Sequence, residues 1–360
     1  MPAPIADAGE LAALAARLGG ADAIGVDTEF LRERTYYAQL CLLQLSAPQL
    51  AVCIDTLQLP DLAALRAPLG APAVQKIMHA ARQDLEVLWS VCGPVRNVFD
   101  TQTAAGLIGL PAQIGYGDLV SRLLGIQLHK GQTRTDWSRR PLSAAQLEYA
   151  LDDVRHLLGL REQLLAKLAE LGRVSWFEEE MRQTDALASF VIDPQQAWRR
   201  VRGLSDLDEG RQRLAQTLGA WRELRAMHAD RPRGWILPDE ALREIVLRVP
   251  RSAAALARIS ELPEGIATRS GPQLLELVSA AAIPDPAPPL PQRHRPEPEQ
   301  LARVARLADL TRKAAQAQAL AAEILATRKE LEKIAAGDLT AAPLVGWRRA
   351  VIGEALLQAL

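Results

Sequence analysis

The sequence predicts an α/β domain with a mixed sheet flanked by helices, followed by two all-helical domains. Residues 23–99 alternate short apolar runs with helical patterns, whereas strand-like alternation is scarce beyond about residue 205. A chain of 360 residues is too long for one ordinary core. The stretch PDPAPPLPQRHRPEPE cannot hold a helix and divides the helical part. We therefore expect domains over residues 1–195, 205–284 and 297–360, with a stiff linker over residues 284–298.

The first elements are a capped helix and three strands. Asp7 and Glu10 have the spacing of a capping box at the start of an amphipathic helix. The runs AIGVDTEF, AQLCLLQLS and LAVCID follow, close enough in sequence to be consecutive antiparallel strands. Residues 35–54 carry no formal charge and have the length of a spanning helix, but their glutamines and the SAPQ turn signal favour a hairpin. We expect no membrane segment.

The next elements alternate between helix and strand. A helix near residues 62–68, the strand AVQKIMH, the helix AARQDLEVLWSVCG and the strand NVFD come in that order. Strand-helix-strand connections imply parallel pairing, so the whole sheet should be mixed. Asp100 should cap the helix that begins at Thr101, and Ser143 should cap one long helix that ends at Gly172.

The composition describes an ordinary globular protein in a reducing compartment. Apolar residues make up 49% and charged residues 24%, and the net charge of −1 excludes a global positive field for nucleic acid. Three cysteines without a CxxC spacing argue against a disulfide framework, and histidines without an HxxxH spacing argue against zinc. With acids in place of a basic, apolar leader, we expect a cytoplasmic location.

Three acidic elements could carry chemistry. Asp27 and Glu29 lie one residue apart on a predicted strand and so share a face. Asp84 lies in the first turn of a later helix, and Tyr149 and Asp153 are four apart on another. Each alone has an ordinary explanation, namely a solvated strand end, an acid favoured by the helix dipole and a core hydrogen bond.

The combination is more informative than its parts. Four carboxylates gathered at one site would repel one another strongly unless they bound divalent cations. Oxygen ligands without His or Cys suit magnesium or manganese. Two such ions roughly 4 Å apart support phosphoryl chemistry. The neighbouring Asp152 points about 100° away around the helix and should be solvated.

The motifs GVDTEF, HAARQDLEVL and YALDDVRHL resemble those of the DEDD exonucleases with tyrosine in the third motif. The stretches FDTQTAAGLIG and TRTDWSRRPLSAAQLEYALDDV are similar to bacterial ribonuclease D. The block over about residues 209–283 resembles the HRDC module, and the last block looks like the second such module of that family. The resemblance implies a ribonuclease H-like exonuclease fold for the first domain.

The resemblance also implies the roles of the site residues. Asp27, Glu29, Asp84 and Asp153 would hold two divalent cations, Mg²⁺ or Mn²⁺, with Asp27 bridging both and Asp84 acting largely through water. Tyr149 would orient the attacking water. The implied activity is 3′-5′ exoribonuclease action that releases 5′-mononucleotides, with trimming of tRNA precursors by a monomer.

Substrate contacts are expected from basic residues near these motifs. Lys130 and Arg140 precede the catalytic helix, and Arg199, Arg200 and Arg202 form a cluster in AWRRVRG. A scaffold role or a solvated helix face explains each of them equally well, and Trp137 should serve packing.

Two other functions remain open from the sequence. A DNA-directed 3′-5′ exonuclease would use the same site, although the sequence lacks the Walker A motif of an attached helicase. A catalytically inert RNA-binding adaptor could have the same fold, but it would be expected to have lost a carboxylate.

Overall fold

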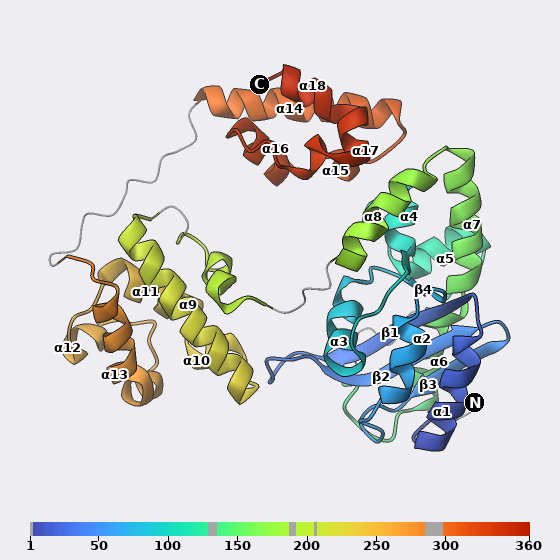
Figure 1. The fold of residues 1–360 in the computed structure, drawn as a ribbon, viewed down its shortest axis with the longest axis horizontal. Helices are drawn as coiled ribbons and strands as arrows, with labels where there is room; N and C mark the ends of the chain where they lie inside the picture. Colours follow the sequence, from blue (N-terminus) through green and yellow to red (C-terminus); the bar gives the residue numbers. More distant parts are fainter. Residues whose placement is uncertain (1–2, 129–134, 187–191, 205–206, 285–297) are drawn as a thin grey trace. The chain divides into compact units, whose positions relative to one another are not determined.

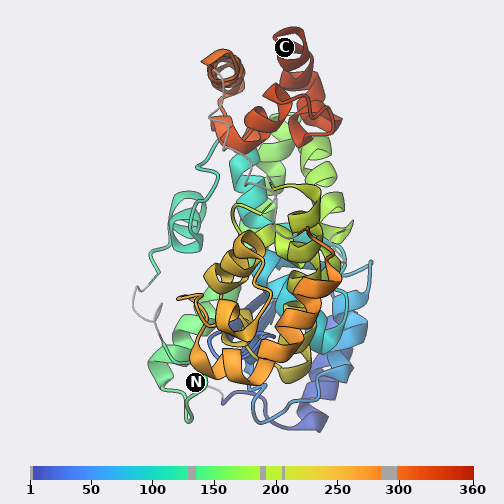
Figure 2. The same cartoon turned by 90° about the vertical axis from the view of Figure 1, so that its left-hand side faces the viewer.

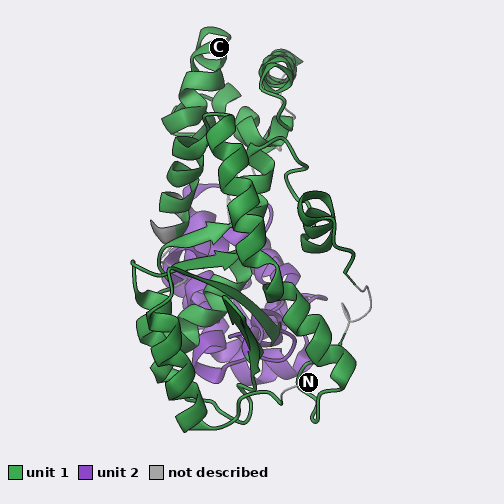
Figure 3. Cartoon of the chain, turned by 90° about the vertical axis from the view of Figure 1, so that its right-hand side faces the viewer, with its two compact units in different colours: residues 1–31, 40–188, 296–360 green, residues 32–39, 189–295 purple. Residues whose placement is uncertain are grey.

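The computed structural model describes residues 3–128, 135–186, 192–204, 207–284 and 298–360. The chain forms two compact units (Figures 1 and 3). Unit 1 comprises Met1–Leu31, Leu40–Ala188 and Pro296–Leu360, and unit 2 comprises Arg32–Gln39 and Ser189–Arg295. No helix among the described residues has the length and hydropathy that a membrane crossing needs.

Unit 1 is built on one five-stranded sheet. Its order is β3-β2-β1-β4-β5. β2 pairs antiparallel with β3, whereas β4 runs parallel to both β1 and β5, so the predicted mixed sheet and the predicted hairpin are confirmed. The strands are β1 (Ala23–Leu31), β2 (Gln39–Ala47), β3 (Leu50–Ile54), β4 (Gln75–Met78) and β5 (Val98–Asp100).

Helices surround this sheet, and the predicted caps place several of them. Asp7 accepts from the backbone of the first turn of α1, Asp100 caps α4 and Ser143 caps α6, as expected. The full capping box forms at Ser143 with Gln146, whereas at α1 the structure gives the Asp7 half of the predicted box. The helical elements are α1 (Ala8–Gly19), η1 (Ala63–Leu65), α2 (Arg66–Gly70), α3 (Arg82–Cys92), α4 (Thr101–Leu107), α5 (Tyr116–Leu124), α6 (Ala144–Arg155), α7 (Leu157–Glu170) and α8 (Val174–Ala186).

The single long helix expected from Ser143 to Gly172 is wrong, because the structure divides it at His156. Side chains from outside the helix take two of its backbone carbonyls just before the break. Tyr116 Oη donates to the Asp152 carbonyl at 2.9 Å, and Ser46 Oγ donates to the Val154 carbonyl at 2.8 Å. Hydrogen bonds from outside the helix weaken the bonds that these carbonyls would otherwise accept from backbone amides one turn later, which explains the break.

The C-terminal block packs as part of unit 1, and its apolar residues share one core with α4, α7 and α8. Trp347 stacks on Trp176 with ring centroids 4.5 Å apart, and its Nε1 donates to Glu180 Oε1 at 2.7 Å. Figure 2 shows the block against the end of the α7–α8 pair. Its elements are α14 (Pro298–Ala317), α15 (Ala322–Leu325), α16 (Arg328–Ala335), η3 (Ala342–Leu344), α17 (Gly346–Arg348), η4 (Arg349–Gly353) and α18 (Glu354–Gln358).

Unit 2 is a helical domain with its own apolar core. The connection Arg32–Gln39 between β1 and β2 belongs to this unit. Tyr36 Oη donates to Glu223 Oε1, and the backbone amides of Tyr36 and Tyr37 donate to Asp230 Oδ1 at 3.0 and 3.1 Å. The helical elements are η2 (Pro194–Arg200), α9 (Glu209–Ala229), α10 (Arg233–Ile236), α11 (Asp239–Arg248), α12 (Ala253–Leu256) and α13 (Glu264–Ala280).

Candidate active site

Strand β1 and helix α6 bring three of the predicted ligands together. Asp27 and Glu29 lie on one face of β1, and Asp153 lies in the last turn of α6. One carboxylate oxygen from each of the three lies within 4.8 Å of the others. Residues 27 and 153 are far apart in sequence, so folding creates this cluster.

A glycine allows the strand and the helix to approach so closely. A Cβ added at Gly25 would collide with Ser46 Oγ and would lie 3.1 Å from the Val154 carbonyl oxygen. Ser46 is itself hydrogen-bonded to that carbonyl. A larger residue at position 25 would therefore push α6, and Asp153 with it, away from Asp27.

The fourth predicted ligand, Asp84, is held at the start of α3. Thr28 Oγ1 donates to Asp84 Oδ1 at 2.5 Å. The turn before α3 is fixed by Asp100, whose carboxylate accepts from the Ala80 and Ala81 amides at 3.1 and 2.9 Å. Asp100 thus supports two helix starts, which agrees with its predicted role as a cap rather than a ligand. Sequence reasoning missed Thr28, although it stands between the two acids of the DTE motif.

Burial and neighbouring negative charges raise the pKa of all four predicted ligands. Burial, with the charges of Asp84, Asp153 and Glu29, raises the pKa of Asp27 well above its usual range. Burial and the charges of Asp153 and Asp84 raise the pKa of Glu29 to about 8. Burial and the charge of Asp152 raise the pKa of Asp153 to about 7. Burial also raises the pKa of Asp84 to about 6, although the Thr28 bond opposes the rise.

Two tyrosines border the carboxylates. Burial and the charges of Asp153, Glu29 and Asp27 raise the pKa of Tyr149, so this phenol keeps its proton throughout the physiological range. Burial and the charge of Asp153 likewise raise the pKa of Tyr116, a residue that the sequence analysis did not single out. Only the tertiary structure reveals Tyr116, because its hydroxyl donates to the Asp152 carbonyl on α6, 36 positions away in the sequence.

Asp152 is not the freely solvated acid that helical phase suggested. Its side chain is 16% exposed and lies 2.5 Å from Arg155 Nη1, and Glu148 pairs with the same nitrogen. The ion pair draws the carboxylate against the helix surface. The acid still has a partner of its own and lies outside the 4.8 Å cluster, which is consistent with a role other than metal binding.

The expectation that Arg140 contacts substrate is not supported by its surroundings. Its Nε and Nη2 donate hydrogen bonds of 2.6 and 2.7 Å to the two carboxylate oxygens of the buried Asp55. The remaining donors reach the carbonyls of Cys41, Trp137 and Arg139. Because a guanidinium has five N–H groups and all five are used here, a phosphate would have to displace a structural bond. Arg140 therefore anchors the segment before α6.

The other predicted substrate contacts lie elsewhere. Lys130 lies outside the described residues. Arg199, Arg200 and Arg202 belong to unit 2, where all three are exposed, and the Arg199 guanidinium lies over the ring of Trp198 at 5.3 Å. Trp137, in contrast, is buried in the core beneath α6, as predicted.

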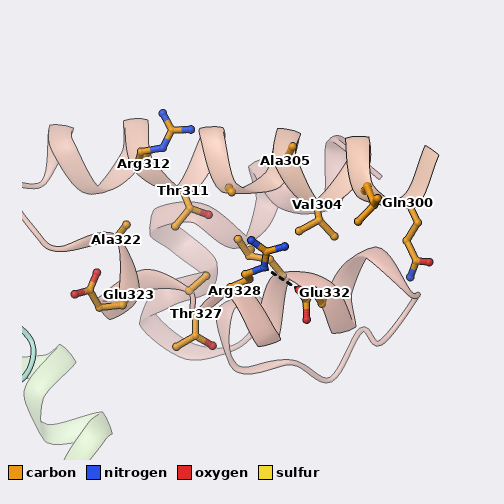
Figure 4. Close-up of a pocket in the computed structure, with 14 residues that line it drawn as sticks. Gln300, Val304, Ala305, Thr311, Arg312, Ala322, Glu323, Thr327, Arg328 and Glu332 are labelled. Atoms are coloured by element: carbon orange, nitrogen blue, oxygen red, sulfur yellow. Dashed lines mark hydrogen bonds and ion pairs between the residues drawn. The ribbon is translucent and has the colours of Figure 1, made fainter. Parts of the chain in front are cut away.

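A separate cavity of about 620 Å³ lies within the C-terminal block (Figure 4). Val304 and Thr311 from α14 and Leu331 from α16 line it, and Arg328 and Glu332 form an ion pair of 2.9 Å at its side. None of the four predicted ligands is among the described residues that line this cavity. The acidic cluster and the cavity are therefore different features of unit 1.

The acidic cluster fits a divalent cation. Its donors are all carboxylate oxygens, the ligands that magnesium and manganese prefer. The repulsion that raises their pKa values is the kind that a bound cation relieves.

Comparisons with known proteins agree with this arrangement. The 3′-5′ exonuclease family matches residues 2–169, and the HRDC domain matches residues 211–278. The chain is 38% identical to ribonuclease D of Gluconacetobacter diazotrophicus, with 99% of this chain and 92% of that protein covered. It is 37% identical to ribonuclease D of Nitrobacter hamburgensis, with 97% and 92% covered. The crystal structure of Escherichia coli RNase D, an exoribonuclease involved in structured RNA processing, matches with a TM-score of 0.89 and 30% identity, covering 100% and 99% of the two chains.

A mixed sheet that gathers carboxylates, joined to an HRDC domain, defines a nuclease of the 3′-5′ exonuclease class. Identity above 35% over nearly the full length makes the assignment more specific. The chain belongs to the ribonuclease D family and is a 3′-5′ exoribonuclease, a hydrolase of phosphodiester bonds.

Proposed function

We propose that Asp27, Glu29, Asp84 and Asp153 hold two divalent cations, Mg²⁺ or Mn²⁺, at this site. The observation that carries the proposal is the cluster of Asp27, Glu29 and Asp153 within 4.8 Å, with Asp84 close enough for its charge to raise the pKa of the first two. Bound at such a site, a metal pair lowers the pKa of a water and stabilises the oxygens of an in-line displacement.

The chain's own residues would place the attacking water and the scissile phosphate. Tyr149 keeps its proton, so its hydroxyl can donate a hydrogen bond to one oxygen and accept one from a water. It projects from α6 one turn before Asp153, and the two residues share a helix face. Holding the water in line with the bond between the scissile phosphorus and the 3′-oxygen of the shortened RNA is therefore the role that suits Tyr149.

The substrate we propose is a tRNA precursor with a 3′ extension, trimmed to release 5′-mononucleotides by a cytoplasmic monomer. The similarity to Escherichia coli RNase D, an exoribonuclease involved in structured RNA processing, supports this substrate class. The HRDC match supports a nucleic-acid contact in unit 2, where the exposed Arg199, Arg200 and Arg202 offer positive charge. We also propose that the chain is divided into domains over residues 1–195, 205–284 and 297–360.

The test compares a 3′-extended tRNA with a DNA strand of matched sequence in magnesium. Wild-type protein should remove nucleotides one at a time from the RNA 3′ end, and a chelator or Asp27→Asn should abolish the reaction. Asp152→Asn is the matched control, because this neighbouring acid pairs with Arg155 outside the cluster, and it should retain activity within a few-fold. Internal cleavage fragments would contradict the exonuclease mechanism, and equal digestion of the DNA strand would contradict the preference for RNA.

A further inference from the structure

Two aromatic side chains of unit 2 are exposed. Among the described residues, Tyr37 and Trp235 are the exposed aromatic side chains, with 45% and 55% of their surfaces accessible. Tyr37 lies on the connection between β1 and β2, and Trp235 lies on α10, so both belong to unit 2. A single exposed apolar side chain needs no explanation, but an exposed ring that is held in a fixed position is a preformed contact surface.

The Tyr37 ring is held in place although it is exposed. Its backbone amide donates to Asp230 Oδ1 at 3.1 Å, and its carbonyl accepts from Thr35 Oγ1 at 2.6 Å. Its ring meets the ring of Tyr36 edge to face, with centroids 4.9 Å apart. Because these contacts already order the residue, Tyr37 would lose little conformational entropy when a ligand packs on its ring.

A buried cluster joins the segment that carries Tyr37 to the segment that carries Trp235. Tyr36 donates to the fully buried Glu223, which also accepts two hydrogen bonds from Arg233. Arg233 lies over the Tyr36 ring and is the first residue of α10, the helix that carries Trp235. The two exposed rings therefore stand on neighbouring segments of one domain.

Exposed arginines accompany the two rings. Arg34 lies on the same connection as Tyr37, and Arg231 lies between α9 and α10. Residues 32–39 carry two arginines against one glutamate. Positive charge beside flat rings suits single-stranded nucleic acid, because its phosphates pair with arginine and its bases stack on aromatic side chains. The chain is an exoribonuclease, so the strand that fits this surface is RNA.

We infer that Tyr37 and Trp235 are base-stacking residues that bind single-stranded RNA of the substrate. The inference specifies the proposed RNA contact of unit 2 and rests on it. The rings would take the faces of bases, and Arg34 and Arg231 would meet the phosphates between them. Since every base has a flat face, this contact would hold RNA without selecting a sequence.

The experiment measures the binding of a fluorescein-labelled single-stranded RNA to the full chain by fluorescence anisotropy, with EDTA present to prevent cleavage. Tyr37→Ala and Trp235→Ala should each weaken binding by about 5–100-fold, the contribution of one base stack. Tyr37→Phe should bind as wild type does, because it keeps the face of the ring. Leu224→Ala is the matched control, since Leu224 is 54% exposed on α9 of the same unit and has no ring.

A second RNA separates stacking from a general loss of structure. An abasic strand of the same length keeps the phosphates and lacks the bases, so the wild type should bind it more weakly than ordinary RNA. In the double variant Tyr37→Ala/Trp235→Ala this preference should largely disappear, because the groups that contact the bases are gone. A loss of structure would instead weaken the binding of both strands equally.

The outcomes separate the inference from the function on which it rests. Alanine variants that bind RNA as tightly as Leu224→Ala would overturn the stacking role, and so would equal weakening for the two strands. Failure of the wild type itself to bind RNA would overturn the RNA contact instead. Should Tyr37→Ala not fold, Trp235→Ala decides alone. If the rings joined two copies of the chain, the alanine variants would lower the molar mass measured by light scattering and keep their affinity for RNA, which would also overturn the inference.

Discussion

Breaking the buried ion pair between Glu223 and Arg233 should strongly destabilise unit 2. The Glu223 side chain is 0% exposed, and Arg233 donates to it twice, from Nε at 2.6 Å and from Nη2 at 2.7 Å. Tyr36 adds a third bond, and the Arg233 guanidinium lies 4.7 Å from the centre of its ring. The change to make is Arg233→Ala, which leaves the carboxylate buried with Tyr36 as its remaining partner in this cluster.

The expected loss follows from the geometry. Removing one member of a buried pair typically destabilises a protein by about 3–5 kcal/mol, because the other charge stays buried. Since the Arg233 side chain is 32% exposed, water can reach Glu223 in part once the guanidinium is gone. We therefore expect about 3 kcal/mol, at the lower end of that range.

Hydrogen exchange measured by mass spectrometry is the suitable assay, because it reports opening of α9 and α10 within the intact chain. Protection there should fall by about 100-fold in Arg233→Ala, the equivalent of about 3 kcal/mol. Arg213→Ala is the control, since its pair with Glu209 is 57% and 87% exposed and should contribute less than about 1 kcal/mol. The double variant Glu223→Leu/Arg233→Met should restore most of the protection.

The pair also predicts a pH dependence. Burial alone would raise the pKa of Glu223, but the bonds from Arg233 and Tyr36 outweigh burial and lower it. A lowered pKa means that the stabilisation is present above the ordinary value of 4.5 and is lost as the pH falls through the folded value. The difference between wild type and Arg233→Ala should thus shrink in acid. Equal losses in Arg233→Ala and Arg213→Ala at pH 7 would refute the reasoning.

Three further predictions concern unit 1. Arg140→Ala should lower the unfolding free energy by about 3–5 kcal/mol, because it leaves the buried Asp55 without its cation. If Arg140 instead bound phosphate, the same variant would raise KM for RNA and leave the thermal midpoint unchanged. In EDTA, the unfolding free energy should fall as the pH rises from 4.5 towards 8, because the folded chain keeps the proton of Glu29 that the unfolded chain releases. Denaturant titrations in which the unfolding free energy rises over this pH range would contradict the prediction. Cys53, buried with a pKa raised to about 12, should resist alkylation until the chain unfolds, and rapid labelling of native protein would exclude its burial.

Local sequence signals predicted what local interactions determine. The caps at Asp7, Asp100 and Ser143 were readable because each capping bond spans three residues or fewer. The β2–β3 hairpin was readable because its turn signal separates two apolar runs. The spacings of Asp27 with Glu29 and of Tyr149 with Asp153 likewise predicted shared faces, although which faces meet depends on the fold.

Contacts between residues distant in the sequence could not be predicted from the sequence. Arg140 meets Asp55 across 85 positions, and nothing in either local pattern distinguishes a structural arginine from one that binds phosphate. Thr28 lies 56 positions from Asp84, so its hydrogen bond cannot be deduced from the motif that contains it. The packing of the C-terminal block against α8 depends on Trp347 and Glu180, which are 167 positions apart.

The break at His156 shows how contacts between distant residues can override a local sequence pattern. The apolar periodicity continues through the break, so sequence alone favours one helix, whereas the bonds from Tyr116 and Ser46 take the carbonyls that would have continued it. The same Ser46 bond holds Val154, and therefore the adjacent Asp153, against β1. The helix break and the carboxylate cluster are therefore linked through one hydrogen bond, from Ser46 Oγ to the Val154 carbonyl. The contact that a periodicity argument could not reveal lies one residue from a predicted metal ligand.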